Sequence, residues 1–116
     1  MANWALRQLG KPYVWAAAGP YSFDCSGLTM RAWQHAGIRL DHWTGTQWTS
    51  GPHVPLSRLR PGDLVFFASN TSDPSTIHHV GIYIGRGMMV DAPYTGADVR
   101  IDSILEPGLI GATRPG

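Results

Sequence analysis

The amino-acid sequence predicts an α+β domain in which helices come first and an antiparallel sheet of about five strands follows. Two observations predict this class. Residues 25–36 carry apolar side chains at helical spacing, whereas the chain beyond residue 63 has short apolar runs separated by glycine-containing turns. Helices followed by strands are typical of α+β domains. The 116 residues suffice for one hydrophobic core, so we expect a single domain over residues 1–116.

The first helix is expected to be short. Asn3 is a good capping residue for a helix over residues 4–9, and Gly10 ends it. Residues 38–59 are irregular and rich in proline and tryptophan. We expect them to form a long structured loop with one helical turn near residues 44–49.

The strands are expected after a proline-glycine turn at residues 61–62. Each is a short run rich in β-branched or aromatic side chains, bounded by turn-forming residues. The expected strands are residues 63–68, 79–84, 88–92, 99–101 and 109–113.

Composition excludes several classes of function. The formal net charge is +1 and no basic run occurs, so we expect no nucleic-acid surface. No apolar stretch reaches the length of a membrane span, and residues 1–10 lack the features of a secretory signal. The single cysteine leaves no internal disulfide. We expect a monomer.

Cys25 is the candidate nucleophile. It follows the capping residue Asp24 at the start of the second predicted helix, which runs to about residue 36 before Gly37. The positive end of the helix dipole favours the thiolate, which is the nucleophilic form of cysteine. The alternative is that Cys25 is a buried structural residue.

A nucleophilic thiol requires a nearby base, and His79 is the candidate. His78 and His79 open one predicted strand, and their side chains must point to opposite faces. His79 shares a face with Gly81, which leaves room beside it for another group. His79 is therefore the better candidate of the two.

Asp91 is the candidate residue for orienting His79. A three-residue loop at residues 85–87 would place Gly81 opposite Asp91, so that Asp91 becomes the diagonal neighbour of His79 on the same face. The alternative is that Asp91 only ends a strand and caps a turn.

Five segments of the chain form a pattern in their order and spacing. They are GKPYVW at 10–15, DCSGL at 24–28, HWTGTQ at 42–47, LRPGDLVFF at 59–67 and HVGIYIG at 79–85. Together they resemble the NlpC/P60 family of papain-like cysteine peptidases over nearly the whole chain.

The resemblance implies a small papain-like domain in which the nucleophile helix packs on an antiparallel sheet. It implies hydrolysis of amide bonds in the stem peptides of peptidoglycan, commonly between D-glutamate and meso-diaminopimelate, outside the cell or in the cell wall. By position, Cys25 is the nucleophile, His79 the base and acid, and Asp91 the third polar residue. Tyr13 matches a tyrosine that helps the oxyanion site. No metal or cofactor is implied.

Three residues are candidates for contacting the substrate. Asp24 and Ser26 match positions that often contact the peptide in the family. Trp43 lies in the long loop, where it either lines a groove or, like Trp48, fastens the loop to the core.

Two departures from the family pattern leave alternatives open. Ala16 and Ala17 stand where the family usually has two glycines, and Asp91 stands where it more often has His, Asn, Gln or Glu. One alternative is a non-catalytic peptidoglycan-binding module, or a structural part of a phage tail or secretion device. Another is a related papain-like amidase or acyltransferase. Export by another segment, by a secretion device or by phage lysis is compatible with the expected location.

Overall fold

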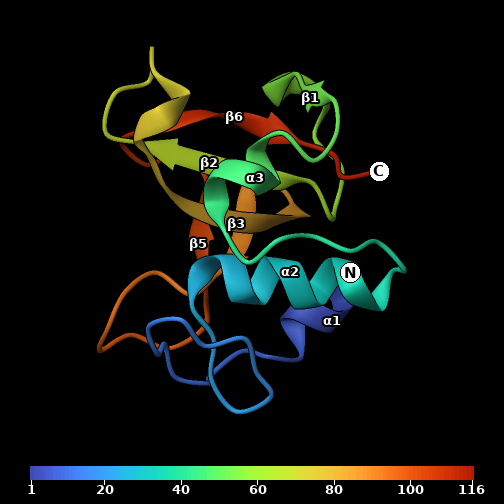
Figure 1. Ribbon diagram of the computed structural model, residues 1–116, viewed down its shortest axis with the longest axis vertical. Coiled ribbons are helices and arrows are strands. Elements are labelled where there is room, and N and C mark those ends of the chain that lie inside the picture. Colours follow the sequence, from blue (N-terminus) through green and yellow to red (C-terminus); the bar gives the residue numbers. More distant parts are fainter.

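The computed structural model describes residues 1–116, and its helices lie against a six-stranded sheet (Figure 1). The helices are α1 (Ala2–Leu6), α2 (Cys25–His35) and α3 (Thr44–Trp48), with two 3₁₀ turns, η1 (Leu56–Arg58) and η2 (Pro74–Thr76). The strands are β1 (His53–Val54), β2 (Leu64–Ala68), β3 (Ile77–Gly85), β4 (Met88–Asp91), β5 (Arg100–Ser103) and β6 (Leu109–Thr113). The predicted α+β class is confirmed.

The sheet is antiparallel throughout, in the order β1-β6-β2-β3-β4-β5. It has one strand more than the sequence predicted. The additional strand β1 consists of two residues, His53 and Val54, which pair with Thr113 and Ala112 of β6. Two residues are too few to show an alternating pattern, so the segment reads as part of the irregular loop.

The predicted limits of α1 were wrong. The helix begins at Ala2 with Met1 as its capping residue, and Asn3 lies inside it. The amide of Ala5 donates to the carbonyl of Met1, so the first turn closes before Asn3 could cap it. The helix ends at Leu6.

The predicted limits of α2 are confirmed to within a residue. The Asp24 side chain accepts a hydrogen bond of 2.6 Å from the amide of Gly27, which caps the helix. Beyond His35 the chain leaves the helix, and Gly37 takes a positive φ of 87° that favours glycine. The long apolar stripe and the two end signals made this helix predictable.

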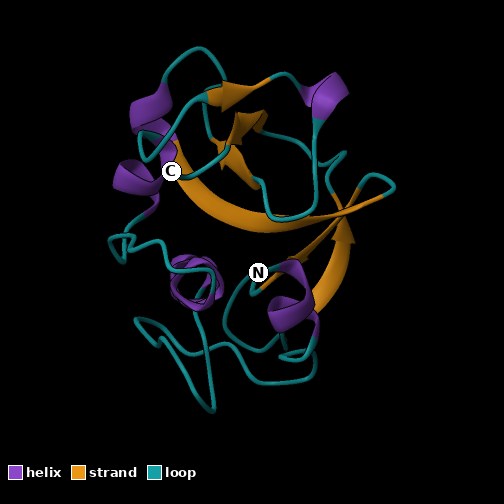
Figure 2. Cartoon of the chain, turned by 90° about the vertical axis from the view of Figure 1, so that its right-hand side faces the viewer, coloured by secondary structure: helices purple, strands orange, loops and turns teal.

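The sheet is curved (Figure 2). An apolar cluster lies on each of its two faces. The larger cluster joins α1 and α2 to the sheet. It includes Ala5, Leu28, Ala32, Leu64, Phe66, Val80, Ile82 and Val90. The smaller cluster, on the other face, consists of Val65, Phe67, Met89 and Ile104. The helix that begins with Cys25 is therefore held on the sheet by side-chain packing.

The long loop is held on α2 by one buried amide. The helical turn expected near residues 44–49 is α3, and its Gln47 is fully buried. Gln47 Oε1 accepts from Thr29 at 2.6 Å, and Nε2 donates to the carbonyl of Ser26 at 3.0 Å. Because a buried amide must find partners, these bonds hold the loop beside the first turns of α2. No helix in the structure has the length and apolar character that crossing a bilayer requires.

Candidate active site

Cys25 is the first residue of α2 and is partly buried. Gly27 explains how the preceding loop approaches the helix, because a Cβ at this position would collide with the carbonyl oxygen of Ala17. That carbonyl accepts a 2.9 Å hydrogen bond from the amide of Asp24. The amides of Cys25 and Ser26 have no acceptor in the structure, so they are free to donate to a ligand.

His79 and Asp91 are hydrogen-bonded. His79 Nε2 donates to Asp91 Oδ2 at 2.9 Å, and their side chains are 11% and 1% exposed. The register of β3 and β4 explains this proximity, since Ile82 pairs with Val90 and Tyr83 with Met89. That is the register expected from the sequence, although the turn itself differs.

The hairpin turn consists of two residues, not three. Arg86 and Gly87 both have positive φ, 57° and 73°, and Gly85 pairs with Met88. A bulge between Tyr83 and Gly85 adds one residue to β3 and restores the register that a three-residue loop would produce.

The space beside Gly81 is not used as the sequence suggested. A side chain there would meet Met89 and Asp91, so the hairpin partner fills the space that was expected to admit another group. Val80 and Ile82 face α2 instead, within the larger apolar cluster. His79 shares its face with Gly81, which is not the face that α2 covers.

A second bulge separates the two histidines. Phe67 pairs with His79 and Ala68 pairs with Ile77, so His78 is left without a partner and is exposed. His79 is mostly buried, and its ring lies 5.7 Å from that of Phe67. The side chain of Cys25 lies close enough to the imidazole of His79 to contribute to the pKa of His79.

The electrostatics of His79 favour its charged form. Burial of the ring lowers its pKa, but hydrogen bonds to Asp91 and Cys25, together with their charges, outweigh burial and raise the pKa of His79 to about 9. Because Nε2 is bound to Asp91, Nδ1 is the ring nitrogen left to exchange a proton with the thiol. This arrangement can hold a thiolate beside an imidazolium.

Tyr13 lies close enough to Cys25 for the charge of Cys25 to affect the pKa of Tyr13. Residues 12–14 run beside Phe23, with the amide of Phe23 donating to Pro12 and that of Val14 donating to Phe23. Burial of the ring, with the charges of Cys25 and Asp24, raises the pKa of Tyr13. Its hydroxyl therefore remains a hydrogen-bond donor at neutral pH.

The three candidate substrate contacts differ in accessibility. Asp24 is occupied by α2 and by His42, whose Nε2 donates to Asp24 Oδ1 at 2.7 Å. Ser26 is only 6% exposed and donates to the same oxygen at 3.5 Å. Trp43 is 64% exposed, next to His42 in the chain, whereas Trp48 packs on Phe66 and fastens the loop.

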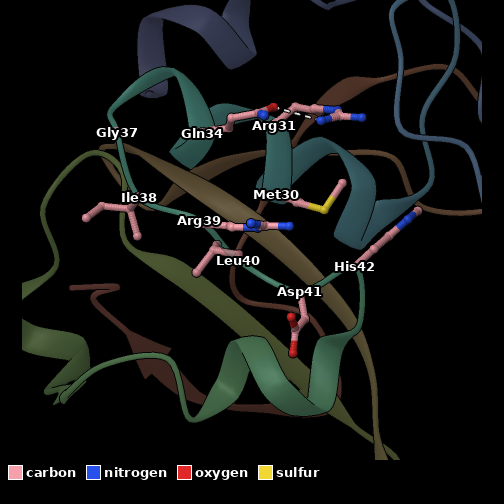
Figure 3. A pocket seen from close by; sticks show the side chains of 9 residues that line it. All are labelled: Met30, Arg31, Gln34, Gly37, Ile38, Arg39, Leu40, Asp41 and His42. Atoms are coloured by element: carbon pink, nitrogen blue, oxygen red, sulfur yellow. Dashed lines mark hydrogen bonds between the residues drawn. The ribbon is translucent and has the colours of Figure 1, made fainter.

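Sequence reasoning assigned no role to His42, which joins the site to a neighbouring pocket. The pocket has a volume of about 530 Å³ and lies along α2 and residues 37–42 (Figure 3). Figure 3 shows His42 at one end of the pocket and Gly37 at the other. Met30 and Arg39 lie between them, and Arg31 lies on α2. The HWTGTQ segment was the one sequence signal that could have pointed to residue 42.

Asp102 is the second residue that sequence reasoning missed. It lies on β5 opposite Met89 and affects the pKa of Asp91. Residues 92–99, between β4 and β5, form an irregular connection in which residues 94–97 make a turn, and the connection is too long for the register of β5 to be counted from it. No sequence signal therefore indicated it.

A thiol at the start of a helix, beside an imidazole held by a carboxylate on an antiparallel sheet, is the arrangement of papain-like cysteine peptidases. Comparison with known proteins agrees. The model of the NlpC/P60 family matches residues 10–113. The chain belongs to the NlpC/P60 family, which is a family of cysteine peptidases.

Two curated relatives are similar in sequence. The peptidoglycan endopeptidase RipA of Mycolicibacterium smegmatis is 38% identical over 117 residues, which cover 90% of this chain and 22% of that protein. The probable endopeptidase p60 of Listeria grayi is 46% identical over 100 residues, which cover 86% of this chain and 18% of that protein. The chain thus spans about a fifth of the length of these relatives.

Solved structures match the fold. An NlpC/P60 family protein from Bacillus cereus aligns with a TM-score of 0.88 at 37% identity, over 97% of this chain and 38% of that chain. The NlpC/p60 domain of the peptidoglycan hydrolase SagA aligns with a TM-score of 0.84 at 32% identity, over 95% of this chain and 92% of that domain.

Proposed function

We propose that this protein is a peptidoglycan endopeptidase in which Cys25 attacks an amide bond of a stem peptide. The single observation that carries the proposal is that Cys25, at the start of α2, lies close enough to the buried His79 to raise its pKa, while Asp91 Oδ2 binds that imidazole at 2.9 Å. Two relatives are themselves named as endopeptidases, and one of these names specifies peptidoglycan. The same observation speaks against a purely structural module, which has no need of a thiol beside a charged imidazole.

The proposed reaction is acyl transfer through a thioester. The Cys25 thiolate attacks the carbonyl carbon, while the free amides of Cys25 and Ser26 and the Tyr13 hydroxyl donate to the oxyanion. His79 Nδ1 then gives its proton to the leaving amine as the carbon–nitrogen bond breaks. Water, deprotonated by His79, hydrolyses the thioester and restores the thiol. No step requires a metal or a cofactor.

Three side chains are proposed to contact the substrate. Trp43 offers an exposed aromatic surface to the peptide, and Asp24 and Ser26 border the first turn of α2. The bond we propose is that between D-glutamate and meso-diaminopimelate, which is the bond that the family resemblance implies. Such a substrate places the action of the protein in the cell envelope.

The test is digestion of a defined mixture of muropeptides by the purified chain, with products identified by mass spectrometry. We expect cleavage at the D-glutamyl bond, and loss of at least 1000-fold in turnover with Cys25→Ala. His79→Gln should lose a similar factor, since the thiolate loses its partner. Asp91→Ala should lower turnover less, because it removes orientation and charge but leaves the base.

The matched control is His78→Gln, which changes the adjacent, exposed histidine. It should retain the activity of the unmodified chain. Unchanged turnover in Cys25→Ala would overturn the mechanism, and cleavage of a different amide would overturn the proposed bond. If no muropeptide is cleaved, the non-catalytic binding module becomes the better interpretation.

A further inference from the structure

One oxygen of the candidate site has no hydrogen-bond donor. The side chain of Asp91 is 1% exposed, and its Oδ2 accepts from His79. Its Oδ1 is buried and has no donor in the structure. A buried carboxylate oxygen without a partner is costly, so the environment of Oδ1 calls for an explanation.

The side chain that can account for the unpaired Oδ1 is another carboxyl group, that of Asp102. In the register of β4 and β5, Asp91 pairs with Arg100 and Met89 pairs with Asp102. Asp102 is therefore the diagonal neighbour of Asp91 on the same face of the sheet, a position from which side chains can touch. Asp102 is mostly buried, with 19% of its side chain exposed.

Two carboxyl groups can form a hydrogen bond only if one of them carries a proton. Arg100 indicates which one is charged, because its Nε donates to Asp102 Oδ2 at 2.8 Å. The guanidinium of Arg100 in turn lies 5.3 Å from the ring of Tyr94. Asp102 is thus held as the carboxylate, and Asp91 Oδ1 is the atom that can carry the proton.

We propose that Asp102 is a positioning residue of the active site that shares a proton with Asp91 and thereby sets the charge that Asp91 presents to His79. The inference rests on the proposed function for its consequence in catalysis, but the proton sharing is a property of the folded chain alone. When the proton is present, Asp91 Oδ1 donates to Asp102 and Asp91 is neutral. When it leaves, Asp91 is an anion that stabilises the imidazolium of His79.

The charges around the pair agree with this assignment. Burial raises the pKa of Asp91, the hydrogen bond from His79 lowers it and Asp102 raises it again, so that it lies at about 6. Burial acts against the charge of Asp102, but the hydrogen bonds from Asp91 and Arg100 lower its pKa. Glu106 and His78 are the other ionisable groups that line the pocket next to His79.

The test is a pH titration of the intact chain, followed by NMR of ring-labelled histidine. The signal of His79 should shift as Asp91 loses its proton near pH 6. In Asp102→Asn this transition should move down by about one pH unit, because the like charge is gone and the amide donates to Oδ1. The acid limb of kcat/KM on muropeptides should move in the same direction.

A second variant predicts the opposite shift. Arg100→Gln leaves the charge of Asp102 uncompensated, so the transition should move upward. Glu106→Gln is the matched control. It removes a carboxylate that lines the same pocket but does not affect the pKa of Asp91, so the transition of Asp91 should not move. Circular dichroism of each variant checks that it is folded.

Equal transitions in the unmodified chain and in Asp102→Asn would overturn the inference. If Asp102→Asn fails to fold, the Arg100→Gln shift decides: a downward or absent shift overturns the inference, and an upward shift supports it. The titration needs no substrate. Absence of hydrolysis by the unmodified chain would therefore contradict the proposed function without affecting this result.

Discussion

His42 Nε2 lies 2.7 Å from Asp24 Oδ1, and this contact joins the long loop to the residue that caps α2. The same oxygen accepts from the amide of Gly27 at 2.6 Å. A single carboxylate oxygen therefore serves both the start of the helix and the loop beside it. The position of Cys25 depends on both bonds, because it lies between Asp24 and Gly27 in the chain.

Both bonds end on the same oxygen of Asp24. The losses in the free energy of unfolding caused by replacing Asp24 and by replacing His42 should therefore not add up. We expect Asp24→Ala to lower the free energy of unfolding by about 1–2 kcal/mol, as loss of a capping residue does. His42→Ala should cost about 0.5–1 kcal/mol, since its side chain is 28% exposed. The double variant, measured by urea unfolding, should cost less than the sum, and strict additivity would show that the two residues do not interact.

Gly27 should tolerate no side chain. An alanine in the interior of a helix normally stabilises it by about 1 kcal/mol relative to glycine. Here the added Cβ would meet the backbone carbonyl of Ala17, which cannot move without breaking its bond to Asp24. We expect Gly27→Ala to destabilise the chain by about 1–3 kcal/mol in thermal unfolding.

Gly45 in α3 provides the comparison for Gly27. The three atoms nearest to a Cβ there all belong to the ring of Trp43, an exposed side chain that can rotate away. Gly45→Ala should therefore be neutral or stabilising. Equal effects of the two substitutions would contradict the steric explanation.

Ala16 should accept glycine with a gain in stability. Its φ is 65°, in the left-handed region that is unfavourable for alanine. Ala16→Gly should raise the free energy of unfolding by up to about 1 kcal/mol. Ala17 does not have a positive φ. Ala17→Gly should therefore lower the free energy of unfolding by about 0.5–1 kcal/mol. Denaturant unfolding distinguishes the two, and the same sign for both would refute the argument from φ.

Stability should decrease with pH in the range over which His79 titrates. Its pKa is raised in the folded chain from 6.5 to about 9, so the folded state binds the proton more tightly than the unfolded state. The resulting stabilisation is complete below pH 6.5 and is lost as pH rises to about 9. The melting temperature of His79→Gln should vary less with pH across this window, whereas His78→Gln should keep the slope of the unmodified chain. A flat profile in the unmodified chain would contradict the assignment.

The elements with long patterns were predictable from the sequence. The stripe and end signals of α2 determined its limits, and the hairpin of β3 and β4 had enough paired residues to bring Asp91 to His79 even though its turn was misjudged. In that hairpin, the bulge near Gly85 compensates for the shorter turn, so a wrong loop length led to the right register.

The parts that could not be predicted depend on contacts between distant segments. His42 and Asp24 are 18 residues apart and meet across the loop that Gln47 holds on α2. Asp102 reaches Asp91 after an irregular connection whose geometry no local pattern encodes. The face of β3 that α2 covers could not be predicted for a similar reason, since packing of α2 on Val80 and Ile82 depends on tertiary contacts.

The two halves of the candidate site are held by different kinds of force. His79 belongs to β3, which is hydrogen-bonded along both edges, whereas Cys25 belongs to a helix held on the sheet by apolar packing and a few loop contacts. Lifting of α2 would separate thiol and imidazole while the strands stay paired. Amide exchange in the first turn of α2 should therefore be faster than in β3, and mild denaturant should abolish activity before the sheet unfolds.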